Sequence, residues 1–222
     1  MLPLVVEGVS KKFNNFPVLE NINFAVKEKE IFGLIGPNGA GKSTLIKIIT
    51  SLLKPDKGKV LIYGSTERKT ISSHLGVVFQ ETILDPLFTV YENLLIHFQL
   101  YGFSKKDFID LAQSLIYDFE LENYLNLRVD KLSGGTKRKV EIVRALIHKP
   151  SILILDEPTL GLDIESRQEL WDLIQKLNND GLTVILSSHY IEEIKICHRV
   201  LVLDKGKINF LGPTEEFFQK LK

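Results

Sequence analysis

"EIFGLIGPNGAGKST", residues 30–44, decides the fold of this chain. An apolar run at 31–35 leads into "GPNGAGKST" at 36–44, and the apolar-periodic segment "KSTLIKIITSLL" starts at residue 42. This order predicts a strand, a glycine-rich loop and a helix. The stretch also fits G-x-x-x-x-G-K-[ST], a pattern whose glycines let successive backbone N–H groups surround the phosphates of a nucleotide.

Each part of the loop has an expected role. The positive dipole end of the helix supports phosphate binding, and Lys42 is expected to reach the β- and γ-phosphates. We expect the Ser43 hydroxyl to bind Mg²⁺ and Thr44 to bond another phosphate oxygen. The expected nucleotide-binding residues are Gly36, Pro37, Asn38, Gly39, Ala40, Gly41, Lys42, Ser43 and Thr44. The motif alone leaves kinases, GTPases and ATPases open.

The rest of the chain reads as an α/β protein with a helical insert. Short strands are expected around 2–9, 20–26, 30–35, 59–64 and 74–80, and continuous apolar runs follow at 151–157, 182–189 and 199–206. Runs that are apolar on both faces favour a parallel sheet covered by helices on each side. Helical patterns fill about 89–148, including 104–121 with Ser104 placed to cap its start. We predict one domain over 1–222, with a core at about 1–80 and 149–222 and a helical subdomain at about 81–148.

Polar residues follow three of these strands. Asp156 and Glu157 come after the apolar run "SILIL", at the carboxyl end of a buried strand, where α/β sheets place their chemistry. If Asp156 faces a metal ion, Glu157 is free to polarise a water as a general base. His189 ends "LTVILSSH" and is a candidate contact for the γ-phosphate. Gln80 ends "LGVVFQ" and is either a loop hydrogen-bonder or a ligand that completes the Mg²⁺ shell.

Composition limits the remaining classes of function. The 28 basic and 28 acidic residues balance, so total charge does not favour a polyanion as the main partner. The lone Cys197 cannot form an internal disulfide, as expected for a reducing cytoplasm. The start lacks the pattern of a secretion signal, and no apolar stretch approaches the ~18 residues that span a bilayer. Any role at a membrane is therefore expected to depend on a partner.

At this point the motifs resemble a family, the ATP-binding-cassette (ABC) ATPases. The matching motifs are "GPNGAGKST" at 36–44, Gln80, "LSGGTKRK" at 132–139, "ILILDEP" at 152–158, "TLGLD" at 159–163 and His189. The resemblance covers essentially the whole chain. It implies a P-loop NTPase core, with a RecA-like, mostly parallel sheet, N-terminal antiparallel strands and an inserted helical subdomain. It further implies an ATPase that uses ATP and Mg²⁺.

The resemblance also implies a purpose for a second glycine turn, Ser133-Gly134-Gly135. In this family two cassettes pack head to tail, and this turn of one subunit covers the γ-phosphate held by the other. A serine hydroxyl, bare backbone N–H groups and a helix N-terminus suit an anion. Asp163, in "TLGLD", matches the family's loop that runs beside its counterpart across the dimer, although a plain first-turn helix residue is the alternative.

Three features depart from the commonest family pattern or refine it. Thr136 stands where the signature usually has Gln, and Phe13 stands where a base-stacking Tyr is usual. Phe13 is therefore either a core aromatic or a stacking platform. "SGGTKRK" resembles the exporter branch associated with drugs, lipids and polysaccharides, while residues 137–139 otherwise read as a solvated basic face.

A transporter subunit is the leading interpretation. The insert after Gln80 is rich in large apolar residues, which fit either core packing or a groove for a partner helix: Leu87, Phe88, Tyr91, Leu94, Phe98 and Tyr101. The resemblance suggests docking of an integral membrane permease there. We expect a second ABC subunit, in a homodimer or heterodimer, no nucleic acid, and a cytoplasmic location at the inner face of the membrane. A soluble ABC ATPase acting on nucleic acid or ribosomes, and a nucleotide-gated binding module, remain alternatives.

Overall fold

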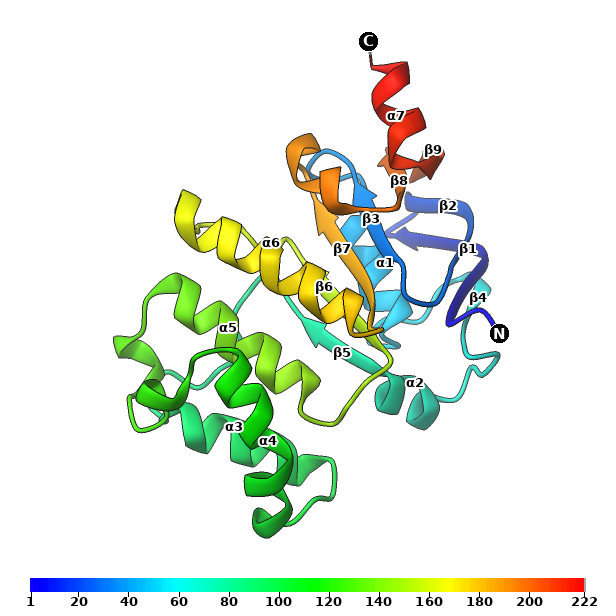
Figure 1. Ribbon diagram of the computed structural model, residues 1–222. Coiled ribbons are helices and arrows are strands. Elements are labelled where there is room, and N and C mark those ends of the chain that lie inside the picture. Colours follow the sequence, from blue (N-terminus) through cyan, green and yellow to red (C-terminus); the bar gives the residue numbers. More distant parts are fainter. Residues whose placement is uncertain (222) are drawn as a thin grey trace.

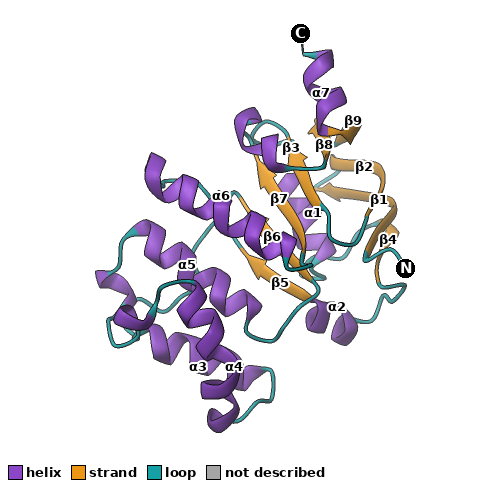
Figure 2. Ribbon diagram, in the orientation of Figure 1, coloured by secondary structure: helices purple, strands orange, loops and turns teal. Residues whose placement is uncertain are grey.

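The computed structural model describes the backbone of residues 1–221 and the side chains of all of these except 109–111. Within this part of the chain the strands form a three-stranded sheet in the order β2-β1-β4 and a six-stranded sheet in the order β5-β6-β7-β3-β8-β9 (Figures 1 and 2). The strands are β1 (Leu4–Phe13), β2 (Phe16–Val26), β3 (Ile31–Ile35), β4 (Lys57–Ile62), β5 (Leu75–Val78), β6 (Ile152–Asp156), β7 (Thr183–Ser188), β8 (Arg199–Asp204) and β9 (Lys207–Pro213). The helices are α1 (Lys42–Ile49), α2 (Arg68–His74), α3 (Val90–Leu100), α4 (Lys105–Asp118), α5 (Gly134–Leu146), α6 (Ile164–Asn179) and α7 (Thr214–Lys220), with short 3₁₀ turns η1 (Glu122–Tyr124), η2 (Val129–Lys131) and η3 (Ile191–Ile196).

The larger sheet is parallel from β5 to β8, and β9 joins it antiparallel. All residues of β3, β6 and β7 are buried, because helices cover the sheet and leave no solvent-facing row. In Figure 1, α1 and α6 lie on opposite faces of the sheet. The predicted mostly parallel α/β sheet is therefore confirmed.

The smaller sheet is antiparallel, as predicted, but its first two strands are longer than expected. They form one hairpin, in which Phe13 pairs with Phe16. Asn14 and Asn15 make the two-residue turn, with φ values of 48° and 66°. Asparagine tolerates this left-handed conformation, and a turn of this kind matches the twist of the flanking strands. The Asn-Asn pair was thus a hairpin signal that the strand pattern alone did not use.

Three helices, α3, α4 and α5, fall between β5 and β6 and occupy the lower part of Figure 1. Two of them begin with a capping box, in which Thr89 pairs with Glu92 and Ser104 pairs with Asp107. Each box satisfies backbone N–H groups that have no partner inside the helix. The predicted cap at Ser104 is therefore confirmed.

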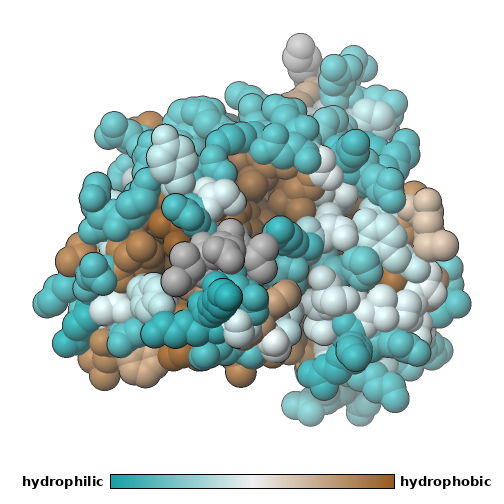
Figure 3. Space-filling view, turned by 60° about the horizontal axis from the view of Figure 1, so that its bottom comes forward, coloured by the Kyte–Doolittle hydropathy of each residue, from teal (hydrophilic) through white to brown (hydrophobic). Residues whose placement is uncertain are grey.

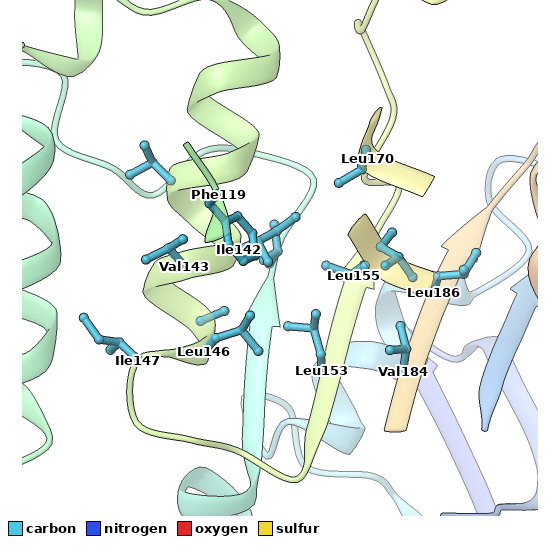
Figure 4. Packing of buried hydrophobic residues seen from close by; sticks show 14 of the residues in the cluster. Phe119, Ile142, Val143, Leu146, Ile147, Leu153, Leu155, Leu170, Val184 and Leu186 are labelled. Atoms are coloured by element: carbon cyan, nitrogen blue, oxygen red, sulfur yellow. The ribbon is translucent and has the colours of Figure 1, made fainter. Parts of the chain in front are cut away.

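The insert and the sheet share one hydrophobic core. Ile142, Val143 and Leu146 of α5 belong to the same buried cluster as Leu153 and Leu155 of β6 (Figure 4). The predicted division into a core and a helical subdomain, with boundaries near 81 and 148, stays a prediction. Whatever its exact limits, α5 cannot move independently of the sheet without opening apolar contacts.

Basic side chains cover the edge of the larger sheet that β5 forms. Alternate carbonyls along and just beyond β5 meet donors from α5 and the residues that follow it: Phe79 O with Arg138 Nη1 at 2.9 Å, Val77 O with Arg144 Nη2 at 3.4 Å, and Leu75 O with His148 Nε2 at 3.1 Å. Free edge carbonyls invite pairing with another strand. The three side chains occupy that row and attach α5 to β5 along its length.

Candidate nucleotide-binding site

The glycine loop between β3 and α1 has a backbone that only glycine supports at two positions. A Cβ on Gly36 would lie 2.1 Å from the carbonyl oxygen of Leu203, so any side chain there would collide with β8. Gly41 is the residue before α1 and has φ of 110°, a conformation that L side chains rarely adopt. The loop therefore turns tightly from a fully buried strand and directs the first N–H groups of α1 outward.

Lys42 is the first residue of α1, and its side chain folds back over the loop. It is only 5% exposed, and its Nζ donates to Gly36 O at 2.8 Å and to Pro37 O at 3.3 Å. A third oxygen, Glu157 Oε1, lies 3.4 Å from the same Nζ. An ammonium group has three N–H bonds. Two of its N–H bonds are therefore used by the loop carbonyls, and the Glu157 carboxylate lies close enough to form an ion pair with the ammonium group.

The strand order brings Glu157 and His189 to this loop. β7 lies between β6 and β3, so the residues that follow β6 and β7 emerge beside the loop that follows β3. Glu157 Oε2 lies 3.1 Å from Nδ1 of His189, and the Glu157 side chain is almost completely buried. Glu157 also has φ of 46°, which is uncommon for a residue with a side chain and typical of functional positions.

Ser187, on β7, is a residue of this site that the sequence reasoning missed. Its hydroxyl donates to Asp156 Oδ1 at 2.5 Å and accepts from the backbone N–H of Glu157 at 3.0 Å. One buried hydroxyl thus holds both carboxylate residues at the end of β6. The register pairs Asp156 with Ser187, and a polar residue one position before the strand-end "SH" was the available signal.

A pocket of about 470 Å³ joins these elements. Its lining residues are Val18, Asn38, Gly39, Gly41, Lys42, Ser43, Thr44, Gln80, Glu157, Leu160 and His189. Sequence reasoning missed Val18, which belongs to no motif, and Leu160, which lies in "TLGLD" but had no predicted role. Of the other predicted loop residues, Ala40 is buried in the core around α1. The pocket combines an ammonium group, helix N–H groups and a carboxylate paired with an imidazole, which suits binding and hydrolysis of a phosphate ester.

Phe13 is not a core residue. Its side chain is 46% exposed beside the turn of the β1–β2 hairpin, and Lys11 Nζ lies 5.6 Å from its ring centroid. Of the two interpretations, core packing is therefore wrong. The ring is exposed, and its stacking role stays a prediction.

The second glycine turn lies apart from this pocket and beside α6. Ser133 precedes α5 and its hydroxyl accepts from Thr136 N at 3.1 Å. A Cβ on Gly135 would lie 2.8 Å from Ser166 Oγ, so the turn packs closely against the first turn of α6. Asp163 caps that helix and accepts from Ser166 N at 2.8 Å, a bond that lowers the pKa of its carboxyl group. The pocket and the second turn thus occupy separate places in one chain.

The basic stretch 137–139 is not the solvated face that its sequence predicts. Arg138 is buried, where its Nη1 bonds Phe79 O and pairs with Glu141 Oε2 at 2.8 Å. A buried guanidinium requires such partners, because desolvation without them is costly. Arg138 therefore connects α5 to the residue before Gln80.

The side chains predicted for Mg²⁺ are chemically suited to that ion. Ser43 and Gln80 line the pocket, and Asp156 lies beside it with one carboxylate oxygen bonded to Ser187. These are hydroxyl, amide and carboxylate oxygens, which Mg²⁺ prefers. Among residues 1–221 outside the undescribed side chains, no cluster of three or more His, Cys, Asp or Glu side chains has metal-binding geometry. A single carboxylate is nevertheless typical for Mg²⁺ that is bound together with phosphates.

The sequence of this chain is similar to those of known ATP-binding proteins. Residues 19–160 match the protein family described as "ABC transporter". The linearmycin resistance ATP-binding protein LnrL of Bacillus subtilis is 35% identical over 222 residues, which cover 98% of this chain and 71% of that protein. The Nod factor export ATP-binding protein I of Rhizobium etli is 39% identical over 225 residues, which cover 100% of this chain and 71% of that protein.

Solved structures agree with the sequence comparison. A nucleotide-free ATP-binding cassette from an ABC transporter superposes with a TM-score of 0.90 at 27% identity, covering 99% of this chain and 94% of that one. The dimeric structure of a post-hydrolysis state of an ATP-binding cassette bound to ADP and Pi has a TM-score of 0.84 at 30% identity, covering 95% of this chain and 98% of that one.

Proposed function

This chain belongs to the ABC transporter family and is an ATPase, and on that premise we propose that it pairs head to tail with a second cassette around ATP and powers an export permease in the membrane. The relatives named for Nod factor export and linearmycin resistance support the direction of transport. A location at the inner face of the membrane, through the permease, is part of the proposal. Within the described helices none is both long and apolar enough to cross a bilayer.

The observation that carries the proposal is the contact of Glu157 with both Lys42 and His189 in one pocket. We assign Lys42 to the phosphates of ATP, because its ammonium group lies over the loop at the N-terminus of α1. Glu157 is the general base that orients and deprotonates the attacking water, and His189 holds that carboxylate and contacts the γ-phosphate. Phe13 is assigned to the face of the adenine base.

Mg²⁺ would be held by Ser43, Gln80 and Asp156, together with phosphate oxygens. When bound, it would neutralise charge that develops on the phosphates. Ser187 fixes Asp156 through its hydroxyl, so this carboxylate has one orientation before any metal arrives. The backbone N–H of Glu157 bonds the same hydroxyl, which keeps the metal-binding and water-orienting carboxylates in a constant relation.

The proposed second subunit is supported by the position of the Ser133 turn, which does not line the pocket of its own chain. Its residues are exposed or only partly buried, and the N-terminus of α5 presents backbone N–H groups there. We assign Ser133, Gly134 and Gly135 to the γ-phosphate in the partner's pocket, and Asp163 to the loop that faces the partner. Loss of the γ-phosphate would remove the charge that both subunits contact, and so open the dimer.

The permease is assigned to the exposed apolar residues of the insert. The aromatic and aliphatic side chains named from the sequence divide into two sets, since Leu94 and Phe98 are fully buried while Leu87 and Phe88 are exposed. Core packing therefore accounts for the buried residues, and the exposed ones support a surface for a partner. Figure 3 brings the lower side of Figure 1 forward and shows hydrophobic residues exposed among hydrophilic ones on that face. Exposed apolar residues in such numbers favour contact with a partner.

Mixing two inactive variants tests the head-to-tail pairing. Ser133→Arg should abolish hydrolysis but leave ATP binding largely intact, because Ser133 serves the neighbouring site. Lys42→Ala should weaken ATP binding itself. In a mixed dimer of the two, one pocket combines a native Lys42 with a native Ser133, so turnover should return. Absence of any recovery, or native turnover by Ser133→Arg alone, would contradict pairing between two copies of this chain.

A further inference from the structure

Glu193 is a buried carboxylate between the two loops that carry the site. It lies in η3, directly after the residues that follow β7, and is 4% exposed. Its Oε1 accepts a hydrogen bond from Thr159 Oγ1, and its Oε2 accepts from Ser188 Oγ at 2.5 Å. Both hydroxyl residues are almost completely buried. The two oxygens of one side chain therefore join segments that are 29 residues apart.

The two hydroxyls lie next to the residues assigned to hydrolysis. Ser188 immediately precedes His189, and Thr159 follows Glu157 by two residues. Ser188 Oγ also accepts from Tyr190 N at 2.9 Å, so its bond to Glu193 holds the backbone on both sides of His189. Glu193 thus determines how far the loop after β6 stands from the loop after β7.

Arg167, on α6, provides the opposite charge that a buried carboxylate needs. Its Nε lies 4.0 Å from Glu193 Oε1, and its guanidinium carbon lies 5.9 Å from the ring centroid of Tyr190. Arg167 is in the first turn of the helix that Asp163 caps. Through this contact the network extends from the two loops to the surface assigned to the partner subunit.

A carboxylate suits this position better than an uncharged side chain. It accepts hydrogen bonds from two hydroxyl groups at once, whereas a carboxamide of the same shape offers one accepting oxygen and one donating NH₂ group. Ser188 Oγ already accepts a hydrogen bond from the backbone N–H of Tyr190. An amide at position 193 would accept from only one of the two hydroxyls, so either Thr159 would lose its acceptor or Ser188 would keep only its longer bond to Tyr190 O at 3.4 Å.

We propose that Glu193 is a positioning residue that keeps Glu157 and His189 in the relation required for hydrolysis, by holding Thr159 and Ser188 with its two carboxylate oxygens. The inference rests on the proposed ATPase site. Glu193 does not line the pocket, so it acts through its neighbours and not on ATP.

Glu193→Gln tests the proposal with an almost unchanged side-chain volume. kcat for ATP should fall roughly tenfold, as expected when a hydrogen bond to a charged group is lost at the site. KM for ATP should stay within about twofold, because Lys42 and the glycine loop do not contact Glu193. Glu192→Gln is the matched control, since Glu192 is the exposed neighbour, and it should retain native kcat.

A second pair of variants separates the hydrogen bond from simple packing. Thr159→Val keeps the shape of the side chain and removes the hydroxyl, whereas Thr159→Ser keeps the hydroxyl and removes a methyl group. Thr159→Ser should retain more of kcat than Thr159→Val. In the Glu193→Gln background, Thr159→Val should add little to the loss, because the two changes break the same bond.

The outcomes distinguish this inference from the proposed function. Native kcat in Glu193→Gln would overturn it, and so would additive kcat losses in the double variant. A lower kcat together with a higher KM and a lower melting temperature would also overturn it, because it would indicate general structural damage. Failure of the native chain to hydrolyse ATP under all conditions would contradict the proposed site, and this inference with it. A kcat loss at native KM that depends on the Thr159 hydroxyl supports it.

Discussion

Glu157 Oε2 lies 3.1 Å from Nδ1 of His189, although the two residues are 32 positions apart in the chain. The same carboxylate reaches Lys42 with its other oxygen at 3.4 Å. Glu157, the residue assigned as general base, is therefore held by His189 after β7 and by Lys42 at the start of α1.

Glu157→Gln should lower kcat by at least about 100-fold, the usual contribution of general-base catalysis. ATP binding should persist, because the glycine loop and Lys42 remain, and the ATP-bound dimer should accumulate since it no longer loses the γ-phosphate. Size-exclusion chromatography with light scattering in the presence of MgATP measures the dimer. Glu192→Gln serves as the control. A variant that stays monomeric with bound ATP would contradict the clamp.

Ser187→Ala should reduce both kcat and stability. The change leaves the buried N–H of Glu157 without its acceptor and releases Asp156, which costs about 1–3 kcal/mol in free energy of unfolding. Urea denaturation and steady-state kinetics measure the two effects. The exposed Ser72 gives the control, because Ser72→Ala removes a hydroxyl outside the site. Equal behaviour of the two variants would refute the bridging role.

Arg138→Leu should destabilise the fold by about 3–5 kcal/mol, because it leaves Glu141 buried without its partner. Replacing both residues, as Arg138→Leu with Glu141→Leu, should recover much of that loss by removing the unpaired charge. Lys137→Leu, at a partly buried position, should have little effect. Free energies of unfolding for the four proteins test this, and a double variant as unstable as Arg138→Leu would show that the pair is not the cause.

His97 should make the protein less stable in mild acid. Burial, and then the charge of Arg144, lower the pKa of His97 from 6.5 to about 3. Above pH 6.5 the imidazole is neutral in both states, so its contribution is fully present. As pH falls toward 3 only the unfolded chain takes up the proton, and stability declines by at most about 1.4 kcal/mol per pH unit. His97→Phe should flatten this decline between pH 6.5 and 4.5, as measured by denaturation, and an unchanged slope would exclude His97 as its source.

Local signals were sufficient for most of the fold. Local signals account for α6, because Asp163 caps its start and its apolar residues repeat with helical period. The apolar runs at 151–157 and 182–189 contain β6 and β7, and a short continuous apolar run is an equally local signal of a buried strand. The β1–β2 hairpin extended further than predicted, because pairing with a neighbour stabilises residues that alternation alone does not mark.

The site was less accessible to such reasoning. Most residues that line the pocket belong to the quoted motifs, but Val18 in the pocket and Ser187 beside it belong to none. Arg138 was assigned to solvent because it lies between two lysines, and only the packing of α5 on β5 buried it beside the carbonyl oxygen of Phe79. Burial depends on what another segment covers, so a charge run cannot be resolved residue by residue from its own composition.

The sequence by itself determined the glycine loop, the strands that end in polar residues and the family to which the chain belongs, because each depends on residues close together in the chain. Only the tertiary structure decided that Lys42, Glu157 and His189 touch, and that Ser187 and Glu193 hold the segments around them. Those contacts follow from the order β6-β7-β3, in which strands distant in sequence become neighbours. Hydrogen bonds act over about 3 Å, and strand order, not sequence distance, decides which groups come that close.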